Sequence, residues 1–269
     1  MGDLIVLPES DALKAEIETL RAELSALFAQ RDELIFVVCK NIETEYMLKI
    51  GGLEHRAYRA QCTYLRLKRK LALIQAKLNR QEAIDLQEID ALLDEEFAEY
   101  QAKLDEQIEK MNSALARSKL ERLSEEESKE LKKLYRQIVK ALHPDLHPDL
   151  TDAQIELFYR AVEAYEHGNL PELRIIAEMI DGELSSDLSE MAAAVLIQQR
   201  DRLEKLLETV RQEIETIKTT FPYSEIELLK DDEAVEARKA ELRELIEEYE
   251  SAIQMYQERI DELMRWKNG

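Results

Sequence analysis

The stretch that decides the fold class runs from residue 10 to residue 50 and reads SDALKAEIETLRAELSALFAQRDELIFVVCKNIETEYMLKI. Large apolar residues recur in it every seven positions, in two interleaved registers. The registers are Leu13, Leu20, Leu27 and Leu34, and Ile17, Leu24 and Val38. Such a repeat forms the seam of a coiled coil. We therefore predict one long helix that ends near Ile50.

The rest of the chain has the same character. Only six glycines and five prolines occur among 269 residues, or 11 of 269, and roughly three times as many would be usual. Four long stretches contain neither residue: 9–50, 53–143, 183–221 and 223–268. We predict an all-α fold, because a sandwich, a barrel or a turn-rich α/β enzyme needs many more chain-reversing residues.

Residues 1–123 are predicted to form an N-terminal arm of three long helices in an antiparallel coiled coil. Gly51-Gly52 is expected to break the first helix and let the chain reverse. A second heptad stripe follows over 53–78, and Asp85 has the position of an N-cap for the third helix.

Residues 185–269 carry two further stripes, separated by a connection that contains Pro222. The stripes are Leu196, Leu203, Val210 and Ile217, and Val235, Leu242, Tyr249, Tyr256 and Leu263. We predict a C-terminal antiparallel hairpin, because a short connection closes at modest entropic cost. A homodimer that pairs through the same C-terminal coil stays open as the alternative.

The segment 124–184 differs from both arms. Ser124 and Thr151 each begin a capping box, which predicts shorter helices over 125–142 and 152–167. Gly168 should end the second helix, and Gly182 a third one. The predicted architecture is therefore two elongated antiparallel coiled-coil or bundle arms that flank a compact helical module.

The module contains LKKLYRQIVKALHPD, residues 131–145, followed by FYRAVEAY at 158–165. These segments resemble helix II, the His-Pro-Asp loop and helix III of a J domain, the module of DnaJ-type co-chaperones. The resemblance covers about residues 124–182. A second His-Pro-Asp follows at 147–149, but only the first copy has Tyr135 in the family's register. The family's usual first helix is not found before Ser124, so the end of the third long helix, with Met111, Leu115 and Leu120, is expected to replace it.

The resemblance implies docking on a DnaK-type chaperone, of the 70-kDa heat-shock class, and stimulation of that partner's ATPase. The chain itself would catalyse nothing and need no cofactor, and its arms would hold protein clients or a coiled-coil partner. The expected chaperone-docking residues are Tyr135, Lys132, Lys133, Arg136, Lys140, His143, Pro144 and Asp145.

The charge pattern agrees with an acidic partner. The chain carries a net charge of −21, yet residues 129–140 hold five basic residues and one acid. Helical spacing places the basic residues along one side and leucine and isoleucine on the other. A basic face of this kind speeds encounter with an acidic surface.

Other residues and segments offer alternative functions. The basic run 56–80 could bind nucleic acid, but the acidic third helix, 82–127, is expected to neutralise it. His143, Asp145, His147 and Asp149 could hold a metal, although the prolines prevent a helical two-histidine site. A further alternative function is a non-catalytic coiled-coil scaffold or adaptor whose J-like module is structural and whose coils bind partners.

The expected location is the cytoplasm. Two cysteines in separate segments suggest reduced thiols, and the first ten residues lack the pattern of a secretory signal. No stretch is apolar for long enough to span a membrane.

Overall fold

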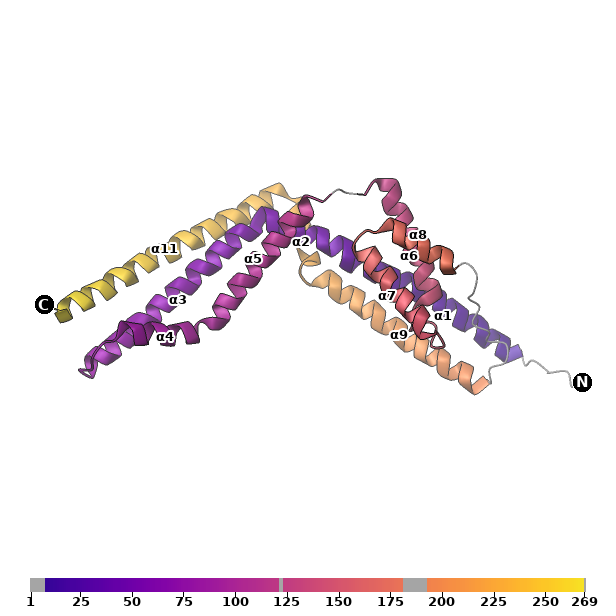
Figure 1. The fold of residues 1–269 in the computed structure, drawn as a ribbon, viewed down its shortest axis with the longest axis horizontal. Helices are drawn as coiled ribbons and strands as arrows, with labels where there is room; N and C mark the ends of the chain where they lie inside the picture. Colours follow the sequence, from indigo (N-terminus) through magenta and orange to yellow (C-terminus); the bar gives the residue numbers. More distant parts are fainter. Residues whose placement is uncertain (1–7, 121–122, 181–192, 269) are drawn as a thin grey trace, which may run out of the picture. The chain divides into compact units, whose positions relative to one another are not determined.

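The computed structural model describes residues 8–120, 123–180 and 193–268. Within these ranges the chain is helical and contains no strand, which confirms the all-α prediction (Figure 1). None of the described helices combines the length and the apolarity that crossing a membrane requires. Contacts between backbone positions divide the chain into two compact units, and each unit combines segments that lie far apart in the sequence.

Unit 1 consists of Met1–Asn41 and Glu121–Ser224. Its helices are α1 (Pro8–Glu33), the π-helical turn η1 (Leu34–Cys39), α6 (Glu125–Leu142), α7 (Asp152–Glu166), α8 (Leu170–Ile180), α9 (Ala193–Thr219) and the 3₁₀ turn η3, which begins at Tyr223. Helix α1 packs along α9, and α6 lies against α1, α7 and α8 (Figure 1). One apolar core joins all of these helices.

Unit 2 consists of Ile42–Leu120 and Glu225–Gly269. Its helices are α2 (Lys40–Tyr46, whose first two residues belong to unit 1), η2 (Met47–Gly51), α3 (Gly52–Asn79), α4 (Leu86–Glu96), α5 (Ala98–Ser118), α10 (Ile226–Lys230) and α11 (Asp232–Asn268). Helix α3 packs along α11 and also contacts α4 and α5. The Asp85 carboxylate accepts hydrogen bonds from two backbone amides at the start of α4, so the predicted N-cap is confirmed.

These two units differ from the three consecutive domains predicted at 1–123, 124–184 and 185–269. Helix α1 pairs with α9, and α3 pairs with α11, so each predicted arm is divided between the two units. The heptad stripes are nevertheless buried as expected, including Ile17 and Leu24 in α1 and Leu203 in α9. A coiled-coil seam specifies that a helix pairs, but several seams of similar length leave its partner open.

Both long pairs run parallel, so the predicted antiparallel pairing of their seams is wrong. Three ion pairs follow the same order along α1 and α9: Glu16 with Arg200, Glu23 with Arg211, and Arg31 with Glu213. In unit 2, α3 and α11 also keep the same order, because Glu54 pairs with Arg238, Tyr64 contacts Tyr249 and Tyr256, and Ile74 shares a core cluster with Ile260. The seam of α11 that a homodimer would use is therefore buried on α3 within one chain.

Gly51-Gly52 does not reverse the chain, so that prediction is also wrong. Both glycines have right-handed helical backbone angles, with φ of −51° and −64°. Gly51 is buried, and a Cβ atom there would lie 2.9 Å from the Met47 Sδ atom and 3.7 Å from Met111 of α5. A Cβ atom would therefore crowd the Met47 side chain of the same helix, whereas its distance from Met111 would be that of an ordinary van der Waals contact. The chain turns instead between α3 and α4, where Gln81 has a φ of 59°.

The helices of the J-like module have the predicted positions. Both capping boxes are present, with Ser124 and Thr151 each bonded to the third residue of the helix it begins. Gly168, with a φ of 68°, ends α7 as expected, whereas Gly182 lies outside the described residues. Leu115 and Leu120 are 46% and 68% exposed, so they do not replace the missing first helix. Helix α1 packs on α6 instead.

Candidate partner-docking site

The loop that follows α6 has a defined turn conformation. His143 ends the helix with a ψ of 123°, the extended conformation that a following proline favours. The amides of Leu146 and His147 both donate to the His143 carbonyl oxygen, at 3.0 and 3.1 Å. The Asp145 amide donates to the His143 Nδ1 atom at 3.2 Å. The His-Pro-Asp segment is therefore held partly by hydrogen bonds within the loop.

The His143 ring is buried between aromatic side chains, with only 6% of the residue exposed. It stacks on Phe28 of α1, with ring centroids 3.7 Å apart and an interplanar angle of 11°. Phe158 of α7 contacts it edge-on at 5.0 Å. Burial lowers the pKa of His143 to about 3, and the positive charges of Arg31 and His147 act in the same direction. At neutral pH the ring is uncharged, which leaves Nδ1 able to accept the Asp145 amide hydrogen.

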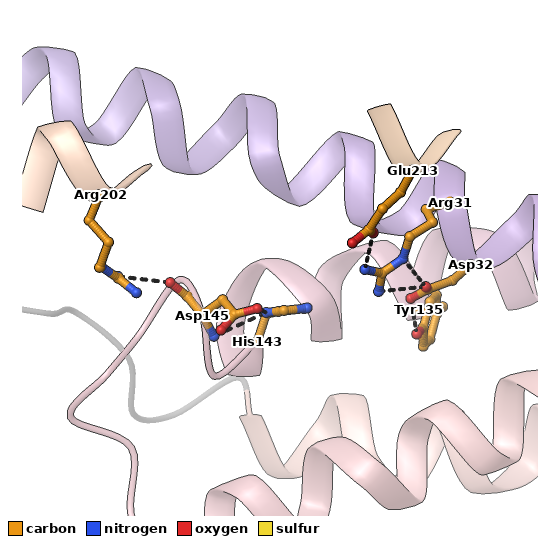
Figure 2. A network of polar contacts seen from close by, with 7 residues as sticks. All are labelled: Arg31, Asp32, Tyr135, His143, Asp145, Arg202 and Glu213. Carbon is orange, nitrogen blue, oxygen red and sulfur yellow. Dashed lines mark hydrogen bonds and ion pairs between the residues drawn. The ribbon is translucent and has the colours of Figure 1, made fainter. Parts of the chain in front are cut away.

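Asp145 places its carboxylate at the surface, where the side chain is 55% exposed. Its backbone carbonyl accepts a hydrogen bond from the Arg202 Nη2 atom of α9 at 2.9 Å (Figure 2). One carboxylate oxygen lies 4.0 Å from the His143 Nδ1 atom, but the neutral ring offers no charge to it. The carboxylate is therefore available to a partner.

Tyr135 lies inside unit 1, with 1% of the residue exposed, although the sequence predicts it as a docking residue. Its ring stacks on Tyr165 of α7 at 4.0 Å, and its hydroxyl donates to Asp32 of α1 at 2.7 Å. Arg31 donates to the same carboxylate and to Glu213 of α9 (Figure 2). Burial and the Asp32 charge raise the pKa of Tyr135, so it stays a hydroxyl donor. This network joins α6 to α1 and α9.

The basic residues of α6 fall into two groups. Lys132 and Arg136 contact the Glu33 carboxylate of α1, at 2.6 and 3.6 Å. Lys133 and Lys140 are exposed, and Arg136 keeps 62% of its side chain exposed. We call the half-buried Pro144 and the exposed predicted residues the docking surface; the exposed residues are Lys133, Arg136, Lys140 and Asp145.

Sequence reasoning missed every residue that α1 and α9 contribute around this surface. They are Phe28, Arg31, Asp32, Glu33, Arg202 and Glu213. Asp32, for example, is 103 positions from Tyr135. In the sequence, Asp32 is recognisable only as an acidic residue beside a heptad seam. Charged residues are common at such positions in any coiled coil, so this feature does not indicate a contact with Tyr135.

The second His-Pro-Asp copy has a different environment. The Nε2 atom of His147 lies 2.8 Å from the Lys140 carbonyl oxygen, near the end of α6. Burial lowers the pKa of His147, while that backbone contact opposes the change. Across the described ranges, no group of three or more histidine, cysteine, aspartate or glutamate residues is placed to hold a metal ion.

The basic run of α3 faces the acidic helix α4, and the predicted internal neutralisation is confirmed for part of it. Arg66 contacts Asp94 at 2.7 Å, and Arg69 holds Glu96 through two hydrogen bonds. Lys70 and Lys77 contact Asp90 and Glu88. These cations are already paired within unit 2, so the structure offers no argument for a nucleic-acid site there.

No protein-family model matches the chain, and no significant match was found among curated proteins or among solved structures. The J-domain resemblance therefore stays a hypothesis that depends on the residues of the module.

Proposed function

We propose that this protein is a J-domain-type co-chaperone that docks on a DnaK-type chaperone and stimulates its ATPase. The observation that carries the proposal is the docking surface, in which the exposed Asp145 carboxylate lies in the loop directly after three exposed cations of α6. The loop joins α6 to α7, two helices that pack together as the resemblance requires.

The cations suit an acidic partner surface. Lys133, Arg136 and Lys140 are spaced at i, i+3 and i+7, so they share one side of α6 over about 10 Å at 1.5 Å per residue. Exposed charges of one sign accelerate association with a surface of the opposite charge, and the rate of that association then depends on the salt concentration. Asp145 adds one negative charge at the end of this surface, which would pair with a cation of the partner and fix the orientation of docking.

Under this proposal the chain performs no chemistry and needs no cofactor. It would bind one conformation of the chaperone more tightly than another and so shift the partner toward the state that hydrolyses ATP. The coiled-coil pairs of the two units would hold a client or a further protein partner. A cytoplasmic location, where such chaperones meet ATP, is part of the proposal.

Steady-state ATP hydrolysis by the DnaK-type chaperone of the same organism tests this function. We expect the full chain to increase the rate in a saturable manner, and Asp145→Asn to abolish the increase. Lys133→Ala combined with Lys140→Ala should raise the concentration that gives half-maximal stimulation, most strongly at low salt. Lys205→Ala, an exposed lysine of α9, is the matched control. No stimulation by the wild type, or equal stimulation by Asp145→Asn, would contradict the proposal.

A scaffold with a structural J-like module is the second candidate. It is favoured by the burial of Tyr135 and His143 and by the Glu33 contacts that hold Lys132 and Arg136. The same assay separates the two functions, because a scaffold would leave the chaperone's hydrolysis rate unchanged.

A further inference from the structure

We propose that Arg202 of α9 and Phe28 of α1 are positioning residues for the His-Pro-Asp loop, so that a docking-competent loop requires helices outside the J-like module. This inference rests on the proposed function. It assigns a role to two residues that the resemblance, limited to about residues 124–182, does not cover.

The first support is that both backbone polar groups of Asp145 are held. Its amide donates to the His143 Nδ1 atom at 3.2 Å, and its carbonyl accepts from Arg202 at 2.9 Å (Figure 2). With both groups fixed, the two peptide planes on either side of the Cα atom are fixed as well. The direction in which the exposed carboxylate leaves the backbone is then set before any partner arrives, which lowers the entropic cost of docking.

The second support is the orientation of the His143 ring. The Nδ1 atom can accept the Asp145 amide hydrogen only while the ring keeps its plane. Phe28 stacks on one face of that ring at 3.7 Å, and Phe158 of α7 contacts it edge-on. Helix α1 thus acts on Asp145 through His143, while α9 acts on it directly.

The third support is that Arg202 contributes little to the apolar core and to the pairing of α1 with α9. It is an exposed residue beside the buried seam residue Leu203, and its removal takes no apolar side chain out of the core. Pairing of α1 with α9 also has three ion pairs of its own, which involve Arg200, Arg211 and Arg31. Loss of the Arg202 side chain should therefore loosen the loop and leave the unit folded.

The test compares Arg202→Ala with Arg211→Ala in the full chain. Both variants remove one arginine from α9, but Arg211 contacts Glu23 of α1 and not the loop. Amide hydrogen exchange is measured first, without any chaperone. We expect Arg202→Ala to speed exchange at Asp145 and Leu146 by roughly fivefold, the effect of losing one hydrogen bond of ordinary strength. Arg211→Ala should leave those two amides unchanged, and the thermal midpoints of both variants should stay close to the wild type.

The second measurement is chaperone ATPase stimulation. Because a loosened loop must be ordered on docking, Arg202→Ala should raise the half-maximal concentration by a similar roughly fivefold factor and leave the saturated rate unchanged. Arg202→Lys keeps a cationic donor and should recover most of the affinity. Phe28→Leu keeps an apolar side chain but removes the stacked ring, and it should speed exchange at the Asp145 amide.

The outcomes separate this inference from the function on which it rests. Unchanged loop exchange in Arg202→Ala overturns the positioning role. So does an unchanged half-maximal concentration while the wild type stimulates and Asp145→Asn does not. If the wild type gives no stimulation, the proposed function is refuted, and the inference with it.

Discussion

Acidification is predicted to destabilise unit 1 through a single buried ring, His143. Its neutral form is stacked on Phe28 and bordered by Phe158, and burial holds its pKa at about 3 against an ordinary value of 6.5. Protonation would place a charge in this aromatic environment, close to the positive charges of Arg31 and His147. The His143 ring therefore binds a proton less readily in the folded state than in the unfolded state.

The sign and the size of the effect follow from these two pKa values. Above pH 6.5 neither state binds the proton, and the full contribution of the neutral ring to stability is present. Below pH 6.5 only the unfolded state binds it, so the free energy of unfolding falls until the pH reaches about 3. At pH 5 the loss is about 2 kcal/mol, from 1.36 kcal/mol for each unit below 6.5.

The assay compares the wild type with His143→Phe, which keeps a ring between Phe28 and Phe158 but cannot titrate. Hydrogen exchange of α6 amides reports the stability of unit 1 at pH 7 and at pH 5 after correction for the intrinsic exchange rate. We expect the wild type to lose about 2 kcal/mol more than the variant over this interval. Titration of His147 and of the carboxylates occurs in both proteins and cancels in the comparison.

Two results would refute this reasoning. Equal losses in wild type and variant would show that His143 does not carry the pH dependence. A histidine ring titration followed by nuclear magnetic resonance, with a midpoint near 6.5 for His143 in the folded protein, would show that the ring is not buried as described.

Three further changes test the packing that holds the site. Tyr135→Phe should lower the free energy of unfolding in urea by about 1.5–3 kcal/mol, because the buried Asp32 carboxylate loses a hydrogen-bond donor. Tyr159 is 62% exposed, so the control Tyr159→Phe should change stability by less than about 0.5 kcal/mol. Equal losses in the two variants would contradict the buried hydrogen bond. Gly52→Ala should stabilise unit 2 by roughly 0.5–1 kcal/mol, because Gly52 is helical and a Cβ there meets no atom within 4 Å. A marked loss of stability in this variant would contradict the helical conformation and favour a chain reversal at Gly52. Ile74→Ala, at a fully buried position, should cost about 2–5 kcal/mol in the same measurement, and a loss below about 1 kcal/mol would place Ile74 outside the core.

Local features of the sequence predicted the elements of the module well. The capping boxes at Ser124 and Thr151 define where α6 and α7 begin, because each satisfies free amides within four residues. Pro144 and Gly168 define where the same helices end. These signals act over short distances, so no knowledge of the rest of the chain is needed to read them.

The same local reasoning failed at Gly51-Gly52, where the pair was expected to break a helix. Glycine lowers helix stability by about 1 kcal/mol, which packing can readily offset. Here Gly51 keeps a helical conformation and is buried beside Met47 of the same helix and Met111 of α5. Whether a glycine breaks a helix or stays within one depends on tertiary packing, which a local sequence pattern does not contain.

The sequence predicted which residues of the module belong to the candidate site, but it predicted their exposure only in part. Lys133, Lys140 and Asp145 are at the surface as the sequence suggests, while Tyr135 and His143 are buried. An aromatic residue or a histidine is equally suited to a core and to an interface, so its type alone does not place it.

The sequence by itself determined that this chain is helical, where α6 and α7 begin and end, and that a His-Pro-Asp loop follows a basic amphipathic helix. Those properties arise from residue spacing and from contacts within a few positions. Only the tertiary structure decided which seam pairs with which, and therefore that α1 and α9 surround the loop. The physical reason is that apolar seams are interchangeable, whereas the choice among them depends on contacts such as Tyr135 with Asp32, which join residues far apart in the chain.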